Sequence, residues 1–534
     1  MLYDLTWLEQ NKPFPPTAEV DRIRRYRQNE ALFDGDHFES SIFRHRGNQD
    51  ELLEMYSQCA RRISRVIGNF EDVISFPVLL NYQRLLSLKT ADLVCGEYPT
   101  ITGSDEDENA KIKAVRDYAE LDRKLYSAVI DISRYGDAVE RIYKDSKGNF
   151  TVTMWDPKEW YPIVAQDGTL NITHHCLCWI VDENPSGPYH RYFLHAQIHE
   201  VDRPGVYEHR VYQLDSYKST IGKLVQTKTV HTGLDVCAVR QLKSFSTTNT
   251  VYGYDDYMPL DSILAEIMAR IGQISVILDK HADPNITGPV SMLSVDSQTG
   301  EYYLKPGKFF AVSPGDTPPA YMTWDGHLSS AFKELEVLIN QLYILSEMGS
   351  AILGDSTGGS QAVSGTAMRF KMAGPLSKAR RIVNSLTLPV RELLSVLTET
   401  IPTNFAPAQL TPGRVPLYNI AVKWSDGLPD DPREQVEIAK LATGATKMMP
   451  LVDAIMEYFG KSNEEAQRWV ELINEENLEM VRSTLDDPNH PGPQDGTGIN
   501  PTAKGSETGM TGFSGQQNRR QDTGKSKQRS DNNV

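Results

Sequence analysis

One short segment has the spacing of a hydrolase nucleophile. Residues 354–358 have the sequence G-D-S-T-G, which matches the G-x-S-x-G pattern around a nucleophilic serine. That serine needs a strand before it and a helix directly after it, with an acid and a histidine later in the chain. Here the pattern predicts a helix before the segment, and the only later histidine is His490. The sequence therefore favours a glycine-rich loop over a catalytic Ser356, and we expect no catalytic residue.

A second group of residues could bind a metal ion. His174, Cys176 and Cys178 alternate along an expected strand, so their side chains share one face. Positions two apart on a strand are separated by about 6.5 to 7 Å, whereas tetrahedral zinc ligands, with sulfur about 2.3 Å from the metal, lie closer together. No fourth ligand is evident in the sequence. Because cysteine is usually buried, we expect core packing, with no metal and no cofactor.

A nucleotide site would need the P-loop pattern G-x-x-x-x-G-K-[ST]. The tripeptide G-K-S occurs at 460–462 and 524–526, but the positions of the required earlier glycine hold Ile455 and Arg519. The sequence therefore predicts no ATPase, and we expect that the chain is not an enzyme.

The charge balance bears on nucleic-acid binding. The net charge is -16, and the last 34 residues carry six lysines and arginines against three acids, so the rest of the chain holds -19. A tight DNA binder neutralises phosphates with a basic surface, which argues against that class. An acidic channel through which DNA slides stays compatible with this balance.

The cysteine count and the hydropathy bear on the compartment. The five cysteines are few and odd in number, as in proteins of a reducing cytosol. No segment has the roughly 20 apolar residues of a membrane span.

The elements that would position these residues follow from hydrophobic spacing. Residues 17–98 are expected to be mostly helical, including 52–67 and 79–94. From about 124 to 246, short alternating segments between turn residues predict an antiparallel sheet. A strand is expected at 418–424. Later helices are expected from Pro432 and over 450–459 and 463–482, and the polar residues 487–534 are expected to be disordered.

The region from 258 to 400 combines two long helices with a small β unit and a glycine-rich loop. Apolar residues recur at helical spacing over 259–281 and again over 328–348, with proline, glycine and β-forming residues between them. A loop with five glycines and four serines follows at 349–365. A helix is expected over 366–386, and Pro389 is expected to bend or break the chain.

This order of elements resembles the phage portal family, in the branch typified by Gram-positive siphophages. The resemblance rests on four segments and their order: N-Y-Q-R-L-L-S-L-K-T-A-D-L-V-C-G-E-Y-P-T-I at 81–101, the paired helices, the loop running into S-G-T-A-M-R-F at 364–370, and V-K-W-S-D-G-L-P-D-D-P-R-E-Q-V-E-I-A-K-L-A-T-G-A at 422–445.

The resemblance implies an α+β, mainly helical portal fold that assembles as a ring. Its parts would be a wing at 1–257, β-rich from about 124, a stem of helices at 258–281 and 328–348, and a clip at 282–327 between them. A channel loop at 349–365 would be followed by a returning wing helix and strand at 366–424, a crown at 425–485 and a tail at 486–534.

The resemblance also implies a function. The chain would form the ring at the capsid vertex, of twelve subunits in the family, through which double-stranded DNA is packaged and ejected. Its partners would be the terminase large subunit, which is the ATPase, then head-completion or adaptor proteins, and the major capsid and scaffolding proteins. The protein would be assembled in the host cytoplasm and located in the virion, with no membrane. The alternatives are a ring-forming head-tail connector without a packaging role and, from another class, a serine hydrolase at Ser356.

The candidate DNA-facing residues lie in the loop, where neutral polar side chains would let DNA pass without a fixed charge contact. They are Gly354, Asp355, Ser356, Thr357, Gly358, Gly359, Ser360 and Gln361. Basic side chains that could also face the channel are Lys333, Arg369 and Lys371, for which a solvated helix face or an intersubunit ion pair is the alternative.

Overall fold

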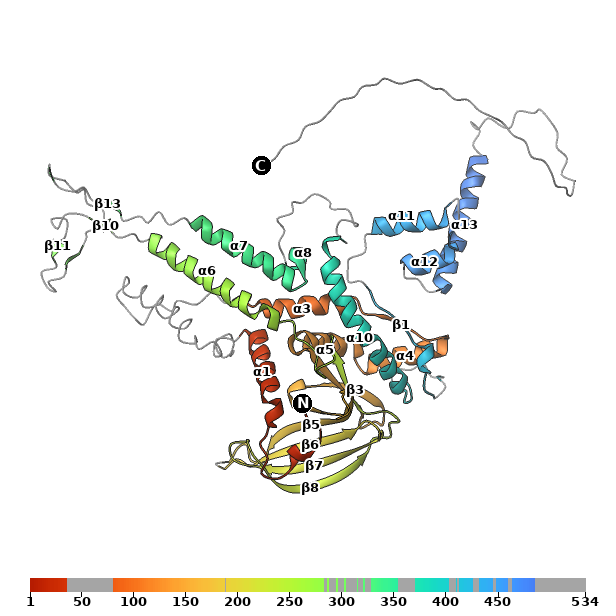
Figure 1. The fold of residues 1–534 in the computed structure, drawn as a ribbon. Coiled ribbons are helices and arrows are strands. Elements are labelled where there is room, and N and C mark those ends of the chain that lie inside the picture. Colours follow the sequence, from red (N-terminus) through yellow and green to blue (C-terminus); the bar gives the residue numbers. More distant parts are fainter. Residues whose placement is uncertain are drawn as a thin grey trace, which may run out of the picture. The chain divides into compact units, whose positions relative to one another are not determined.

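A computed structural model gives the fold (Figure 1) and divides the chain into two compact units, Met1–Asp431 and Pro432–Val534, which we describe separately. The described residues are 1–35, 80–187, 189–282, 328–353, 370–402, 413–425, 432–444, 448–459 and 463–485, with short pieces at 286–287, 294–295, 302–303, 315, 320–321 and 410. Within them, no helix is both long and apolar enough to cross a membrane.

Among the described residues, the α-helices that precede the larger sheets of the first unit are α1 (Val20–Asp34), α3 (Tyr82–Cys95), α4 (Glu106–Tyr118) and α5 (Leu121–Tyr135). Side-chain caps begin two of them, because the Asn81 amide oxygen accepts the backbone N–H of Arg84 and the Asp105 carboxylate accepts that of Glu108. The helix expected at 79–94 is confirmed as α3, α1 lies within the region expected to be mostly helical, and the helix expected at 52–67 lies outside the described residues.

Two antiparallel sheets follow. The smaller contains β2 (Asp137–Lys144), β3 (Phe150–Trp155) and β9 (Val239–Lys243) in the order β3-β2-β9. The larger is a five-stranded meander in chain order: β4 (Trp160–Val164), β5 (Ile172–Asp182), β6 (Tyr192–Glu200), β7 (Val206–Leu214) and β8 (Ile221–His231). A two-stranded pair joins β1 (Thr100–Thr102) to β14 (Ala421–Lys423), which confirms the strand expected at 418–424.

The boundary expected at about 124 is wrong, because α5 extends to Tyr135 and the first long strand begins at Asp137. Leu125, Val129 and Ile132 lie on one buried face of α5, at the three- and four-residue spacing of a helix. Gly136 ends this helix with a φ of +86°, in the left-handed region that favours glycine.

The two long helices of the sequence prediction are confirmed as α6 (Asp261–Ala282) and α7 (Leu328–Leu345). Between them, β10 (Ile286–Thr287) pairs with β13 (Ala320–Tyr321), and β11 (Ser294–Val295) pairs with β12 (Tyr302–Tyr303). The pairing of β10 with β13 joins the chain leaving α6 to the chain entering α7. The two helices lie side by side as the arms of a hairpin (Figure 1).

Two expectations for the chain after α7 are corrected. Part of the expected loop is helical, since α8 covers Gly349–Leu353, and α10 (Ala373–Leu397) continues through Pro389 without a break. Leu386, Val390 and Leu393 are buried on both sides of that proline. Burial of this continuous apolar face outweighs the hydrogen bond that proline removes.

The main hydrophobic core collects α3, α5, α6, α7 and α10 around the smaller sheet. A second core lies on one face of the five-stranded sheet and is completed by the N-terminal segment, from which Trp7, Leu8 and Phe14 pack against Tyr161 and Cys178. Within the first unit, the helices and the five-stranded meander are thus stabilised by separate apolar clusters.

The second unit contains α11 (Pro432–Thr443), α12 (Leu451–Phe459) and α13 (Asn463–Leu485). Pro432 opens α11 as predicted, where its missing N–H leaves no intrahelical bond unmade. Ala454, Ile455 and Ala466 are buried between α12 and α13.

Candidate channel region and the helices that hold it

The expected channel residues fall largely outside the described residues. This is so for Arg369 and for the loop residues Gly354, Asp355, Ser356, Thr357, Gly358, Gly359, Ser360 and Gln361. Lys333 on α7 and Lys371 just before α10 are described, and both are exposed. Neither forms an ion pair with another described residue. What the structure describes in detail is therefore the frame of helices from which the segment 354–369 emerges.

The paired helices α6 and α7 are held by an apolar seam and one interhelical ion pair. Leu264 and Ile267 of α6 and Leu342 of α7 are buried in the main core. Further along the hairpin, Arg270 Nη2 lies 3.0 Å from the Glu334 carboxylate. The opposite side of α7 carries exposed apolar side chains, including Val337 and Ile344, the latter 65% exposed. One face of the hairpin is thus packed in the main core, and another face carries apolar side chains that the described residues leave exposed.

The end of α7 and the start of α10, which precede and follow the segment 354–369 in the chain, approach each other closely. Gly349 adopts a φ of +66°, and a Cβ built on it would lie 3.7 Å from the Lys371 carbonyl oxygen. A Cβ on Gly374 would lie 3.3 Å from the Glu347 carbonyl oxygen. Arg381 Nη2 lies 2.5 Å from the carboxylate of the same Glu347. Close backbone approach at Gly374 and one ion pair therefore hold residues 347–349 beside residues 371–374, and we call this contact the neck.

Beneath this neck lies a buried polar node centred on Asp256. Its Oδ2 atom lies 2.8 Å from Lys378 Nζ and accepts a hydrogen bond of 2.6 Å from the Ser133 hydroxyl. Lys378 Nζ also donates to the Ser346 carbonyl oxygen at 3.4 Å, and Thr90 Oγ1 donates to Asp256 at 3.4 Å. The node connects α3, α5, the end of α7, the chain entering α6, and α10.

The carboxylates of Asp255 and Asp261 hold α1 next to the Asp256 node. Arg25 donates to Asp255 through Nη2 at 3.0 Å and to Asp261 through Nη1 at 2.7 Å. Asp255 also accepts the backbone N–H groups of Tyr257 and Met258 and so caps the turn that leads into α6. Two cations from distant helices thus neutralise the acidic residues at the base of α6.

Sequence reasoning did not identify this node. The one available signal was the run Y-D-D-Y at 254–257 directly before a predicted helix. Its cationic partners Arg25 and Lys378 lie far away in the chain, and only the fold brings them there.

Comparison with known proteins places part of the chain in a family. Residues 77–220 match the family described as "Phage portal protein, SPP1 Gp6-like". This part of the chain therefore resembles phage portal proteins. The match confirms the resemblance inferred from the sequence and covers the region from just before α3 to the turn before β8.

Two solved structures have chains similar to this one. The first is titled "Virion of native gene transfer agent (GTA) particle", with a TM-score of 0.38, 12% identity, and coverage of 70% of this chain and 88% of that chain. The second is titled "Neck of empty GTA particle computed with C6 symmetry", with a TM-score of 0.42, 12% identity, and the same coverage of 70% and 88%. No curated protein matches the sequence.

The cysteines of the portal-family segment pack as the sequence predicted. Cys176 and Cys178 on β5 are buried in the second core, and burial raises the pKa of the Cys176 thiol to about 12. His174 is half-buried, and its Nδ1 atom lies 3.1 Å from the Thr173 hydroxyl. Such protonated, buried thiols are poor nucleophiles and poor metal ligands. Ser356 and His490, the residues of the hydrolase alternative, lie outside the described residues.

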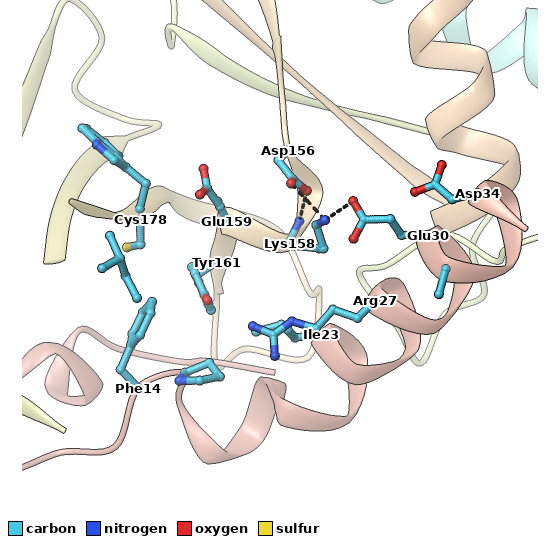
Figure 2. Close-up of a pocket in the computed structure, with 14 residues that line it drawn as sticks. Phe14, Ile23, Arg27, Glu30, Asp34, Asp156, Lys158, Glu159, Tyr161 and Cys178 are labelled. Atoms are coloured by element: carbon cyan, nitrogen blue, oxygen red, sulfur yellow. Dashed lines mark hydrogen bonds and ion pairs between the residues drawn. The ribbon is translucent and has the colours of Figure 1, made fainter. Parts of the chain in front are cut away.

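A pocket of about 660 Å³ lies between α1 and the start of the five-stranded sheet (Figure 2). Lys158 Nζ bridges Glu30 at 2.5 Å and Asp156 at 3.3 Å on its rim. Glu159 lines the same pocket, and partial burial, together with the nearby Asp156 carboxylate, raises its pKa to about 7. The volume of the pocket is in the range of small-molecule sites, and its lining includes Cys178, one of the three residues of the metal pattern considered from the sequence.

Proposed function

We propose that this chain is a portal subunit, which forms with further copies the ring at the capsid vertex through which double-stranded DNA enters and leaves. The observation that carries the proposal is the match of residues 77–220 to the phage portal family. The hairpin of α6 and α7 supports it, because two long helices with a small β unit between them have the arrangement that a stem would need.

The mechanism is geometric rather than chemical, so no residue is assigned a catalytic step and no cofactor is needed. Copies of the chain would close a ring through heterologous contacts, in which one face of a subunit meets a different face of the next. The exposed apolar side chains of α7 suit such a contact, because a neighbour would remove them from water. The ring, of twelve subunits in our proposal, then encloses a tunnel.

Within the tunnel, the segment 354–361 would line the narrowest part, with Lys333, Arg369 and Lys371 as candidate basic contacts. The acidic balance of the chain suits passage better than tight binding, since few lysine or arginine contacts would hold the phosphates. Residues 425–485 would form the crown and 486–534 a tail.

The partners follow from this assignment. Residues 282–327, between the two stem helices, would form the clip that docks the terminase large subunit during packaging and head-completion or adaptor proteins afterwards. The wing would contact the major capsid and scaffolding proteins. ATP hydrolysis would belong to the terminase, and the protein would assemble in the host cytoplasm before it becomes part of the virion.

Negative-stain electron microscopy of the purified protein tests the ring directly. We expect rings with an axial hole wide enough for duplex DNA, and monodisperse monomers at both low and high salt would contradict the proposal. Removing the protein from infected cells then tests the packaging role. Empty capsids are expected, whereas filled capsids without tails would instead identify a connector that acts only after packaging.

A further inference from the structure

We infer that the Asp256–Lys378 pair, together with the Ser346 carbonyl, is a clasp that ties the end of α7 to α10, the two helices that precede and follow the segment 354–369. The role in DNA passage rests on the proposed function, but the clasp itself can be tested on the isolated protein. Lys378 is thereby assigned as a positioning residue, since it acts through the chain on either side of that segment rather than on DNA.

Lys378 is well placed to fix the end of α7. Its Nζ atom donates to the Ser346 carbonyl oxygen, just beyond the last residue of α7. Carbonyl groups at a helix C-terminus lack intrahelical partners and carry the negative end of the helix dipole. Ser346 and Lys378 are only 4% and 6% exposed. The Lys378 ammonium group therefore gives a hydrogen-bond donor to a carbonyl oxygen that is buried away from water.

Asp256 holds that ammonium group from the other side. It is itself fixed by the Ser133 hydroxyl of α5, which also accepts a hydrogen bond of 3.0 Å from Ser87 of α3. The Ser87 hydroxyl lies 2.6 Å from the hydroxyl of Tyr257, the residue after Asp256. The carboxylate thus belongs to a buried network anchored in the main core, and Lys378 connects α10 to that network.

The two glycines show why the clasp matters for the segment above it. Gly374 allows α10 to approach the end of α7 closely, since a Cβ on it would lie 3.3 Å from the Glu347 carbonyl oxygen, and the left-handed φ of Gly349 turns the chain away from α7 beside Lys371. Contact between two backbone segments that have no side chains between them contributes little attraction. The buried ion pair below and the exposed Glu347–Arg381 pair beside it therefore provide the main polar contacts that keep the neck closed.

Hydrogen exchange measured by mass spectrometry on the full-length protein, in whatever assembly it forms, tests the clasp. Lys378→Met keeps the length of the side chain and removes its charge. We expect exchange to accelerate by at least about tenfold in peptides covering 345–353 and 370–378, because removing one partner leaves Asp256 charged and uncompensated. Arg380→Met, an exposed change on the same helix, is expected to alter exchange there by less than about twofold.

A second set of variants keeps the test decisive if Lys378→Met does not fold. Asp256→Asn retains an oxygen for Ser133 while removing the charge, and the double variant removes both members of the pair. If the two residues act as one unit, the double variant accelerates exchange no more than the worse single variant. Additive effects, or unchanged exchange in folded protein, would overturn the clasp.

DNA packaging distinguishes the clasp from the proposed function. If Lys378→Met opens the neck and lowers packaging while ring assembly persists, both stand. If Lys378→Met opens the neck without lowering packaging, while deletion of residues 355–361 does lower it, the positioning role is wrong. If packaging is insensitive to both changes, the channel assignment fails while the clasp stands as a structural feature.

Discussion

The guanidinium of Arg270 on α6 lies 3.0 Å from the carboxylate of Glu334 on α7, and both side chains are partly exposed. Arg270 also lies 2.9 Å from Glu266 one turn earlier on its own helix. The hairpin of long helices is thus joined by an apolar seam at its base and by an electrostatic contact further along, where the apolar contribution is smaller.

Reversing the charge of Glu334 tests this contact. Glu334→Arg places two cations together, and we expect it to lower the stability of the first unit by about 1 kcal/mol, since partly exposed pairs contribute little. Thermal unfolding at low and high salt measures the change, which should shrink as salt screens the charges. The charge-swapped double variant, with Arg270→Glu added, is expected to recover most of the loss; failure to recover it would mean that other contacts were disrupted.

A charge on the outer face of α7 should separate ring assembly from folding. Ile344 is 65% exposed in the single chain, so Ile344→Glu is expected to change the unfolding temperature of the monomer very little. In an assembled ring the same carboxylate would be desolvated without a partner, which costs several kcal/mol. Mass photometry should show rings lost in favour of smaller species. Lys113→Glu, an exposed change on α4, is the matched control, and equal assembly of both variants would contradict the proposed contact.

The pocket near the N-terminus predicts a pH-dependent contribution to stability. The pKa of Glu159 is raised to about 7 in the folded protein, so its carboxyl group favours folding when protonated and opposes it when ionised. The loss of folding free energy caused by ionised Glu159 grows as the pH rises from about 4.5 to about 7. We expect Glu159→Gln to be more stable than the wild type by about 1 kcal/mol at pH 8, after allowing for partial exposure, with the difference vanishing below pH 4. Denaturant unfolding at both pH values measures it, and an equal difference at both would exclude ionisation as the cause.

Shortening the glycine-rich segment tests the channel assignment. Deleting residues 355–361 shortens the chain between α8 and α10 and leaves the residues of the neck unchanged. We expect intact rings, seen by electron microscopy, with DNA packaging reduced at least about tenfold. Replacing the same seven residues by a glycine-serine sequence of equal length is the control, and unchanged packaging after the deletion would count against a channel role.

The elements that the sequence predicts well are those whose pattern is long and uninterrupted. α6 and α7 follow from apolar residues such as Leu264, Ile267 and Leu342 at helical spacing, and Pro432 marks the start of α11. The sheet boundary was misplaced because α5 directly precedes β2, separated from it only by Gly136. Pro389 was expected to bend or break its helix because local chemistry alone cannot show that Leu386 and Val390 are both buried.

The site was less predictable for a different reason. The glycine-rich segment is visible in the sequence as composition, but the node that holds its ends depends on contacts between residues far apart in the chain. Nothing local distinguishes Lys378 from its exposed neighbour Arg380, although one is buried against Asp256 and the other lies in solvent. The packing of α10 on the main core determines that Lys378, and not Arg380, forms the ion pair with Asp256.

The placement of the meander has a consequence for how the family can vary. β3 and β9 lie on the two sides of β2, since Val139 is opposite both Trp155 and Gln241, so the chain leaves for the five-stranded sheet and returns at points roughly 10 Å apart. A segment whose entry and exit are so close can be treated as an insertion, and surface insertions are well tolerated. Hairpins of the meander can therefore lengthen or shorten while the helices around Asp256 keep their arrangement.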